Sequence, residues 1–266
     1  MRLRLSCCAW ALAYSEAAVL TDLAGAGFEW IDVRPQALRS PGSRQRLEDL
    51  GLRVSCVAAA FPEVPLDSAD EVAAKSARAS VSAALTHARD LGATMAYVVP
   101  GMDAQPAALN RFAHALEQLA EQALALGLKL GVEHFPGRSL PSVAATLAFV
   151  RGIGHPNLYL LLDTGHAQIS GEDPAAAIEL AGSRLGYVHL NDNDGRQDLH
   201  LGLLDGVLTR ETLRRTLVAL GAIGYEGAVS LELHPQLPDP LPAIRRSVAI
   251  LAEFLPPSRS APAARR

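Results

Sequence analysis

The fold of this chain is decided by the stretch from residue 158 to residue 192, which reads LYLLLDTGHAQISGEDPAAAIELAGSRLGYVHLND. Two apolar runs, at 158–163 and 186–191, have the length and residue types of buried strands. The segment 174–181 between them is rich in alanine and opens with proline, which favours the first turn of a helix. A strand, a helix and a second strand in this order predict a parallel βαβ unit.

The same alternation extends in both directions from this unit. Further strands are expected at 3–9, 30–33, 53–58, 95–99, 129–134 and 228–233. Further helices are expected at 15–26, 43–50, 70–91, 106–126, 141–151, 210–220 and 242–254. Glycines close several of these helices, at Gly27, Gly51, Gly92, Gly127 and either Gly221 or Gly224. Glycine there suits a helix C-cap, and proline at positions 106, 141 and 174 suits a first helical turn.

Eight such units predict an α/β protein with a single-domain (β/α)8 TIM barrel over residues 1–255. The tail 256–266, rich in Pro, Ser, Ala and Arg, is expected to be disordered. A doubly wound open sheet would place its ligand on a glycine-rich first turn, but residues 9–12 read AWAL. Residues 1–13 also resemble a short signal peptide. We favour a strand, because its loss would leave an open barrel edge.

Composition narrows the class of protein. The 266 residues are 49% hydrophobic and 20% charged, which permits a large core and argues against disorder. No apolar run has the roughly 18 residues that span a bilayer, so no membrane partner is expected. The net charge is −4 without a basic stripe, so no nucleic-acid partner is expected. Three cysteines, an odd count, suit a reducing cytoplasm better than a disulfide framework.

Ionisable residues close four consecutive apolar strands, namely Glu133, Asp163, His189 and Glu232. In a barrel these positions converge at the C-terminal mouth, where active sites lie. Three carboxylates there would repel one another unless a cation or protons compensate. Together with one imidazole they suit a divalent metal ion, Mn²⁺, Mg²⁺ or Co²⁺, with Zn²⁺ as a further candidate. The alternative is four separate residues that cap loops or form ion pairs.

Other polar residues follow the same strand ends. His166 lies three residues after Asp163, in the expected loop above the site, and Asp194, Asp198 and His200 follow the seventh strand. Their functional interpretation is acid–base catalysis, substrate contact or a further metal ligand; the alternative is a solvated loop. Histidines on helices or before strands are expected to be structural: His87, His114 and His155. Two others nearer the mouth stay open: His134 and His234.

The order of these residues resembles the xylose isomerase-like TIM-barrel superfamily, most specifically between residues 187 and 235. That group includes sugar isomerases and epimerases, inosose and dehydroshikimate dehydratases, and apurinic endonucleases. The resemblance implies metal ligation by Glu133, Asp163, His189 and Glu232. The expected catalytic groups are Glu232, His166 and His200. The expected substrate contacts are His166, Arg138, Asp194, Asp198 and Trp10.

Two departures from the family pattern bear on the reaction. The endonucleases add metal-binding histidines on earlier strands, and the matching segments 57–60 and 98–101 contain none. The ketose epimerases carry a catalytic glutamate six residues after the first ligand, where this chain has Ser139, so their two-glutamate proton shuttle lacks one member. The neighbouring Arg138 is expected to bind an anionic group instead.

The sequence therefore predicts a divalent-metal-dependent isomerase or epimerase that acts on a small sugar or hydroxy-keto substrate through an enediolate. The alternatives are a dehydratase of the same family, a metal-dependent nuclease and a sugar-binding barrel without turnover. The expected partner is a small sugar or keto acid in the cytoplasm, and a homo-oligomer is left open. Only two lysines, both away from the mouth, argue against a Schiff-base aldolase, and no Gly-x-Ser-x-Gly motif is present.

Overall fold

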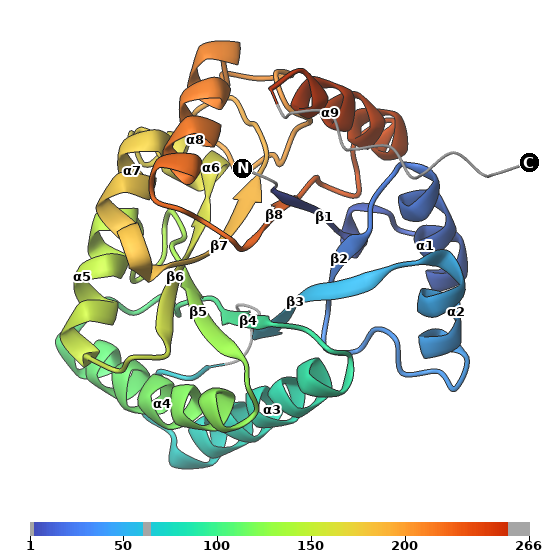
Figure 1. Cartoon of the computed structure of the whole chain (residues 1–266). Helices are drawn as coiled ribbons and strands as arrows, with labels where there is room; N and C mark the ends of the chain where they lie inside the picture. Colours follow the sequence, from blue (N-terminus) through green and yellow to red (C-terminus); the bar gives the residue numbers. More distant parts are fainter. Residues whose placement is uncertain (1–2, 61–64, 255–266) are drawn as a thin grey trace, which may run out of the picture.

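The computed structural model describes residues 3–60 and 65–254. Within this part, eight parallel strands close into a barrel in the order of the chain, and the helices surround it (Figure 1). The strands are β1 (Arg4–Cys8), β2 (Trp30–Val33), β3 (Arg53–Ala60), β4 (Met95–Val98), β5 (Lys129–Glu133), β6 (Leu158–Asp163), β7 (Leu185–Leu190) and β8 (Ala228–Leu231). The predicted (β/α)8 barrel is confirmed.

The α-helices agree with the sequence-based ranges except at their ends and at one short element. They are α1 (Glu16–Gly25), α2 (Ser43–Leu50), α3 (Glu71–Asp90), α4 (Pro106–Ala125), α5 (Val143–Ile153), α6 (Thr164–Ile169), α7 (Pro174–Ala181), α8 (Arg210–Ala222) and α9 (Pro240–Phe254). Short 3₁₀ turns are η1 (Ala9–Ala11) and η2 (Gly182–Arg184). The placement of residue 166 in a loop is wrong, because α6 begins directly at the end of β6.

One of the two predictions about the ends of the chain is confirmed, and the other concerns residues that the structure does not describe. β1 pairs with β2 and with β8 and so closes the barrel, as expected if residues near the N-terminus form a strand. The expected disordered tail, 256–266, lies outside the described residues. In the described ranges no helix is both long and apolar enough to traverse a lipid bilayer.

The joints between elements confirm most of the glycine pattern. Gly51 follows α2 with φ of 67°, a left-handed conformation that favours glycine at a helix end. Pro141 is not in the first turn of α5, because Ser142 is the N-cap and its side chain accepts a hydrogen bond from the Ala145 amide. Pro174 does lie in the first turn of α7.

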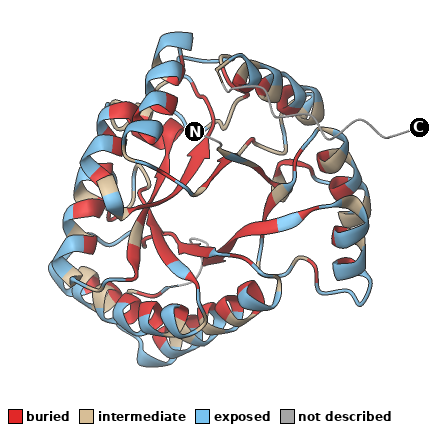
Figure 2. Ribbon diagram, in the orientation of Figure 1, coloured by how far each residue is buried: buried red, intermediate tan, exposed pale blue. Residues whose placement is uncertain are grey.

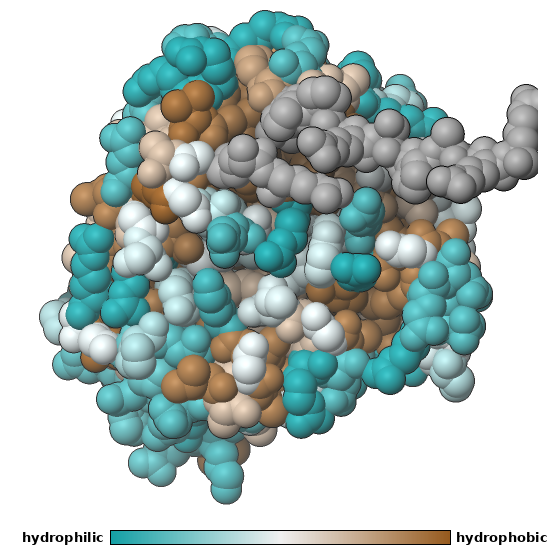
Figure 3. All heavy atoms as spheres, in the orientation of Figure 1, coloured by the Kyte–Doolittle hydropathy of each residue, from teal (hydrophilic) through white to brown (hydrophobic). Residues whose placement is uncertain are grey.

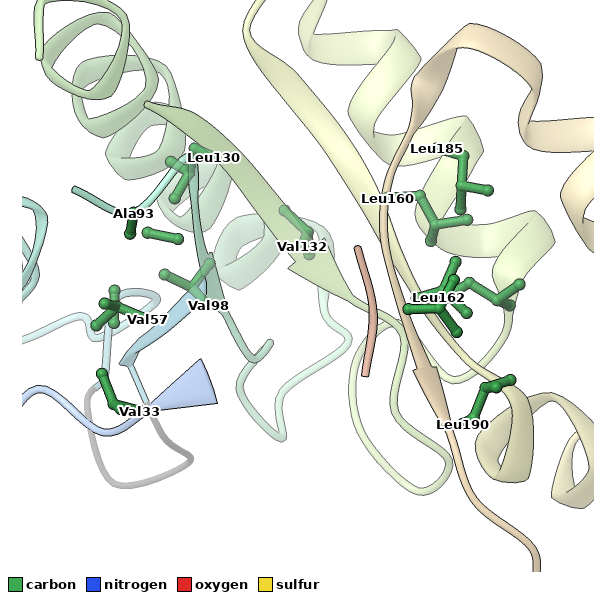
Figure 4. Packing of buried hydrophobic residues seen from close by; sticks show 14 of the residues in the cluster. Val33, Val57, Ala93, Val98, Leu130, Val132, Leu160, Leu162, Leu185 and Leu190 are labelled. Atoms are coloured by element: carbon green, nitrogen blue, oxygen red, sulfur yellow. The ribbon is translucent and has the colours of Figure 1, made fainter. Parts of the chain in front are cut away.

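Side chains of the strands alternate between two cores. Leu130, Val132, Leu160 and Leu162 point away from the barrel axis into the layer beneath the helices (Figure 4). The smaller inner cluster consists of Cys56, Ala58, Met95, Tyr97, Val99, Leu161, Tyr187 and Ala228. Figure 2 shows the strands almost entirely buried, and Figure 3 shows mainly hydrophilic residues around the periphery of the same face.

This alternation decides where the polar strand-end residues point. Asp163 lies two residues after Leu161, and His189 two residues after Tyr187, and both of those apolar side chains belong to the inner cluster. Residues two apart on a strand share a face. Asp163 and His189 therefore point into the barrel, at its C-terminal end.

Candidate metal centre and active site

The four predicted ligands meet at the C-terminal mouth. Glu133 ends β5, Asp163 ends β6, His189 lies near the end of β7, and Glu232 directly follows β8. One ligand atom from each lies within 4.8 Å of the others. His189 Nδ1 is 2.7 Å from Glu232 Oε2 and 3.6 Å from Glu133 Oε1. The structure brings together side chains that span almost one hundred residues of sequence.

Strand register accounts for this convergence. Asp163 of β6 is the direct partner of His189 of β7. His189 is in turn the partner of Ser230 of β8, two residues before Glu232. Because side chains two residues apart on a strand share a face, Glu232 follows Ser230 toward the barrel interior.

The donor atoms fit a cation better than they fit one another. His189 Nδ1 and Glu232 Oε2 are close, yet both are buried and neither has a hydrogen-bond partner among the described residues. Buried polar atoms without a partner are costly and rare. Both atoms point into the space shared with Glu133 and Asp163. A donor set of three carboxylates and one imidazole suits a divalent ion at that place.

The electrostatics of the cluster also call for positive charge. Burial alone would lower the pKa of His189, but Glu232, Cys8 and Asp32 together outweigh burial and raise this pKa well above its usual value. Burial likewise acts to raise the pKa of Glu232, and the neighbouring His189 and His200 outweigh it and lower the pKa to about 2. Burial raises the pKa of Glu133. Protons on imidazoles thus compensate the carboxylates, a role that a metal ion would also fill.

Asp163 is held in place through both of its carboxylate oxygens. Oδ1 accepts a hydrogen bond of 2.8 Å from the His166 amide and so caps α6, and Oδ2 accepts one of 2.6 Å from Asn191 Nδ2. A Cβ at position 165 would lie 1.9 Å from Asn191 Oδ1, so glycine permits the close approach of α6 to this amide. Such contacts behind a ligand fix its orientation toward a metal.

A second group of polar side chains lies beside the ligands. Asp198 Oδ1 is 3.3 Å from His166 Nε2 and 2.9 Å from His200 Nε2. The other nitrogens face backbone carbonyls, because His166 Nδ1 is 2.9 Å from the His134 oxygen and His200 Nδ1 is 3.2 Å from the Glu232 oxygen. Ligand atoms of these three side chains also lie within 4.8 Å of one another. The predicted acid–base residues are therefore assembled around one carboxylate.

Both histidines of this group are surrounded by negative charge. Burial acts to lower the pKa of His166, but Asp163, Asp198 and Glu133 outweigh it and raise the pKa to about 9. Burial of His200 is outweighed in the same way by Glu232 and by the hydrogen bond with Asp198, which raise its pKa to about 10. His200 also has a φ of 44°, an uncommon backbone conformation for a residue other than glycine. Such conformations concentrate at functional sites.

Comparison with known proteins agrees with the fold. The family model for the xylose isomerase-like TIM barrel matches residues 20–254. The chain belongs to this family. L-ribulose 3-epimerase from Mesorhizobium japonicum is 29% identical over 226 residues, which cover 80% of this chain and 73% of that protein. A solved structure of L-ribulose 3-epimerase matches with a TM-score of 0.81 at 25% identity, covering 95% of this chain and 94% of the other.

Not every relative within the xylose isomerase-like family is an epimerase. Inosose dehydratase from Lacticaseibacillus casei is 29% identical over 103 residues, which cover 37% of this chain and 35% of that protein. The longer matches are to sugar epimerases, in agreement with the prediction of a sugar isomerase- or epimerase-like enzyme. The family and the enzyme class inferred from the sequence are both confirmed.

Three of the predicted substrate contacts lie at different distances from the ligand cluster. Trp10 Nε1 donates a 3.0 Å hydrogen bond to Glu232 Oε1, which places its indole at the cluster. The Arg138 guanidinium lies 4.9 Å from the Phe135 ring centre, and Phe135 contacts His166 with ring centres 4.3 Å apart. Asp194 is exposed, and its carboxylate accepts hydrogen bonds from the backbone amides of residues 196 and 197 in a local turn. Its hydrogen bonds in the described structure do not reach the ligands.

Sequence reasoning missed one buried acid. Asp32 lies in β2, is fully buried, and its Oδ2 is 3.5 Å from His189 Nε2. A carboxylate inside the apolar run WIDV is the signal in the sequence, although Asp32 neither ends a strand nor lies in a loop after one. The histidines expected to be structural do make ordinary contacts away from the mouth, with Ala37 for His87, Gln118 for His114 and Glu121 for His155.

Proposed function

We propose that this protein is a divalent-metal-dependent epimerase or isomerase of a small ketose or related hydroxy-keto compound. The observation that carries the proposal is the convergence of Glu133, Asp163, His189 and Glu232 at the barrel mouth. The family membership and the epimerase relatives support the same chemistry. We propose Mn²⁺, Mg²⁺ or Co²⁺ as the metal, because hard carboxylate oxygens dominate the donor set.

The reaction would be proton transfer next to a carbonyl. A bound divalent cation would act as a Lewis acid that makes this carbon acidic. Glu232 is the proposed base, since its Oε1 is oriented by the Trp10 indole and its charge is maintained by neighbouring histidines. Return of the proton to the opposite face of the same carbon gives an epimer, whereas its return to the neighbouring carbon gives an isomer. His166 and His200 would contact substrate oxygens and hold or move protons there.

Ser139 gives a specific reason to keep dehydration as a second candidate. It is buried and occupies the position at which the related epimerases are expected to carry a second acidic group. With one carboxylate fewer, the enzyme would need another group to return the proton from the opposite side. In a dehydration the β-hydroxyl would leave as water together with the proton that Glu232 removed, so no proton would have to return to carbon from the opposite side, and the partial match to inosose dehydratase supports this candidate.

Substrate recognition is proposed to involve Arg138, Asp198 and Trp10, with Asp194 in the loop after β7. Arg138 Nη1 donates to the Pro100 carbonyl at 3.3 Å, while its buried Nε has no hydrogen-bond partner among the described residues. A carboxylate or phosphate on the substrate would satisfy that nitrogen.

The three cysteines are buried and free, which supports a reducing compartment such as the cytoplasm.

The test combines metal analysis with a substrate panel. Protein stripped with a chelator and then loaded with Mn²⁺ is incubated in D₂O with ketoses, hydroxypyruvate and keto-inositols, and products are followed by NMR. Metal-dependent deuterium incorporation next to the carbonyl, with about one ion per chain, supports the proposal. Loss of water in place of deuterated epimer indicates the dehydratase. Three ions per chain with cleavage of abasic DNA indicates a nuclease, and full turnover by the stripped protein contradicts metal dependence.

A further inference from the structure

Asp32 is a buried carboxylate whose two oxygens have different surroundings. Its Oδ1 accepts hydrogen bonds from Ser6 Oγ at 3.0 Å, Ser55 Oγ at 2.5 Å and Tyr187 OH at 2.5 Å. These hydroxyls come from β1, β3 and β7. The carboxylate is therefore held from three strands at once, and its orientation inside the barrel is fixed.

The second oxygen faces the candidate metal centre. Asp32 Oδ2 lies 3.5 Å from His189 Nε2 and 3.7 Å from Cys8 Sγ. Among the ion pairs of the described residues, the one that includes Asp32 is formed with His189. The three hydroxyls all bind Oδ1, so the imidazole of His189 is the group of opposite potential charge that faces Oδ2.

The imidazole of His189 presents opposite nitrogens to two acidic groups. Nδ1 faces Glu133 and Glu232, and Nε2 faces Asp32. The ring is also enclosed edge-on by Tyr97 and Tyr187, with ring centres 5.4 and 5.7 Å away. A metal-binding nitrogen must be free of its proton, so the proton of the neutral ring must then lie on the other nitrogen.

We propose that Asp32 is a positioning residue that holds the proton on His189 Nε2 and so presents Nδ1 to a divalent metal ion. This inference rests on the proposed metal-dependent function. Carboxylates behind metal-binding histidines fix the tautomer and orientation of the ring, and their loss weakens metal affinity about 10- to 100-fold. Asp32 reaches the site from β2, on the far side of the barrel from the ligand-bearing strands.

The first test measures Mn²⁺ affinity by calorimetry in the wild type, Asp32→Asn and Ser55→Ala. Asp32→Asn keeps the side-chain shape and removes the charge that faces Nε2, so its affinity should fall at least tenfold. Ser55→Ala removes one hydroxyl from Oδ1 and leaves that charge, so its affinity should change less than about threefold. The substrate KM at saturating Mn²⁺ should stay within about twofold in Asp32→Asn, because no substrate contact is removed.

The second test reads the tautomer directly and does not depend on folding of Asp32→Asn. Metal-free protein labelled with ¹⁵N-histidine is measured at alkaline pH, where the ring is neutral, and the His189 signals are assigned by their absence in His189→Gln. A proton on Nε2 in the metal-free protein supports the inference, because ligation of a metal cannot account for it, and a proton on Nδ1 overturns it even if Asp32→Asn fails to fold. If the wild type binds Mn²⁺ and turns over substrate, and Asp32→Asn binds Mn²⁺ with the same affinity, this inference alone is overturned. Wild type that binds no divalent metal overturns both proposals.

Discussion

The two halves of the barrel contribute to the mouth in different ways. Strands β5 to β8 each supply one ionisable side chain at or just beyond their C-terminal ends, and these four side chains converge. Strands β1 to β4 end instead in small or apolar residues, as in Val57 to Ala60 of β3. Their polar contributions come from the middle of β2, through Asp32, and from the turn after β1, through Trp10.

The two halves of the closed barrel therefore have different roles at the mouth. The second half offers donor atoms to a ligand, and the first half offers groups that orient those donors. Trp10 acts on Glu232, and Asp32 acts on His189, in both cases from the opposite part of the sequence. Closure of the barrel by pairing of β1 with β8 makes these contacts possible.

The largest effect is expected for a ligand of the second half. Glu133→Gln removes a charged donor from the cluster, so bound metal should be lost and kcat/KM should fall by about 10³-fold or more, about 4 kcal/mol. Metal content by elemental analysis and steady-state kinetics give the readout. Glu117→Gln, on the exposed face of α4, is the matched control and should change neither quantity. Retained metal and activity in Glu133→Gln would remove the distinction between the halves.

The next effect concerns the packing behind Asp163. In Gly165→Ala the new Cβ would collide with Asn191, so the protein should lose about 1–3 kcal/mol of stability. Gly25→Ala in the first half meets open space in a helical conformation and should be neutral or gain up to about 1 kcal/mol. Thermal or denaturant unfolding of both variants measures the difference. Equal stabilities would show that α6 is not tightly packed against the site.

A smaller effect is expected within the first half, between its two tryptophans. Trp10→Phe removes the indole N–H that binds Glu232, so kcat should fall about tenfold, since a hydrogen bond to a charged group contributes about 1.5–3 kcal/mol. Trp30→Phe changes the opposite end of the barrel, where the ring contacts Arg4 and Arg53, and should leave kcat within about twofold. Equal losses in both variants would contradict a specific role for Trp10.

The smallest effect is expected for histidines away from the mouth. His155→Gln removes the pairing of a mostly buried imidazole with the exposed Glu121 and its hydrogen bond from the Asn157 amide, so metal content and kcat should stay unchanged while stability falls by about 1 kcal/mol. His166→Gln, measured in parallel, should lower kcat because His166 contacts Asp198 beside the ligands. A loss of activity in His155→Gln would show that position relative to the mouth does not decide function.

Much of the fold was predictable because its signals are local. Apolar runs gave all eight strands, and the ends differ by one or two residues where pairing adjusts them. β3 extends to Ala60 because a register shift against β4 occurs between Ala58 and Ala60. β8 ends at Leu231, although the Glu232 amide still reaches the Leu190 carbonyl. α6 was missed because six residues directly after a strand are too few for a helical period.

The site was predictable in the half where chemistry coincides with strand ends. Glu133, Asp163 and His189 interrupt or close apolar runs and were named for that reason. Asp32 was not named, because its partner Tyr187 is 155 residues away and no local pattern indicates that pairing. Trp10 was expected to contact the substrate, but its hydrogen bond to Glu232 depends on barrel closure and has no local signal in the sequence.

The most direct measurement is an anomalous difference map from crystals of the wild-type protein soaked in MnCl₂. We expect one strong peak among the carboxylates of Glu133, Asp163 and Glu232 and the Nδ1 atom of His189. No peak there, or a sole peak elsewhere on the molecule, would contradict the claim that strands β5 to β8 form a common metal centre.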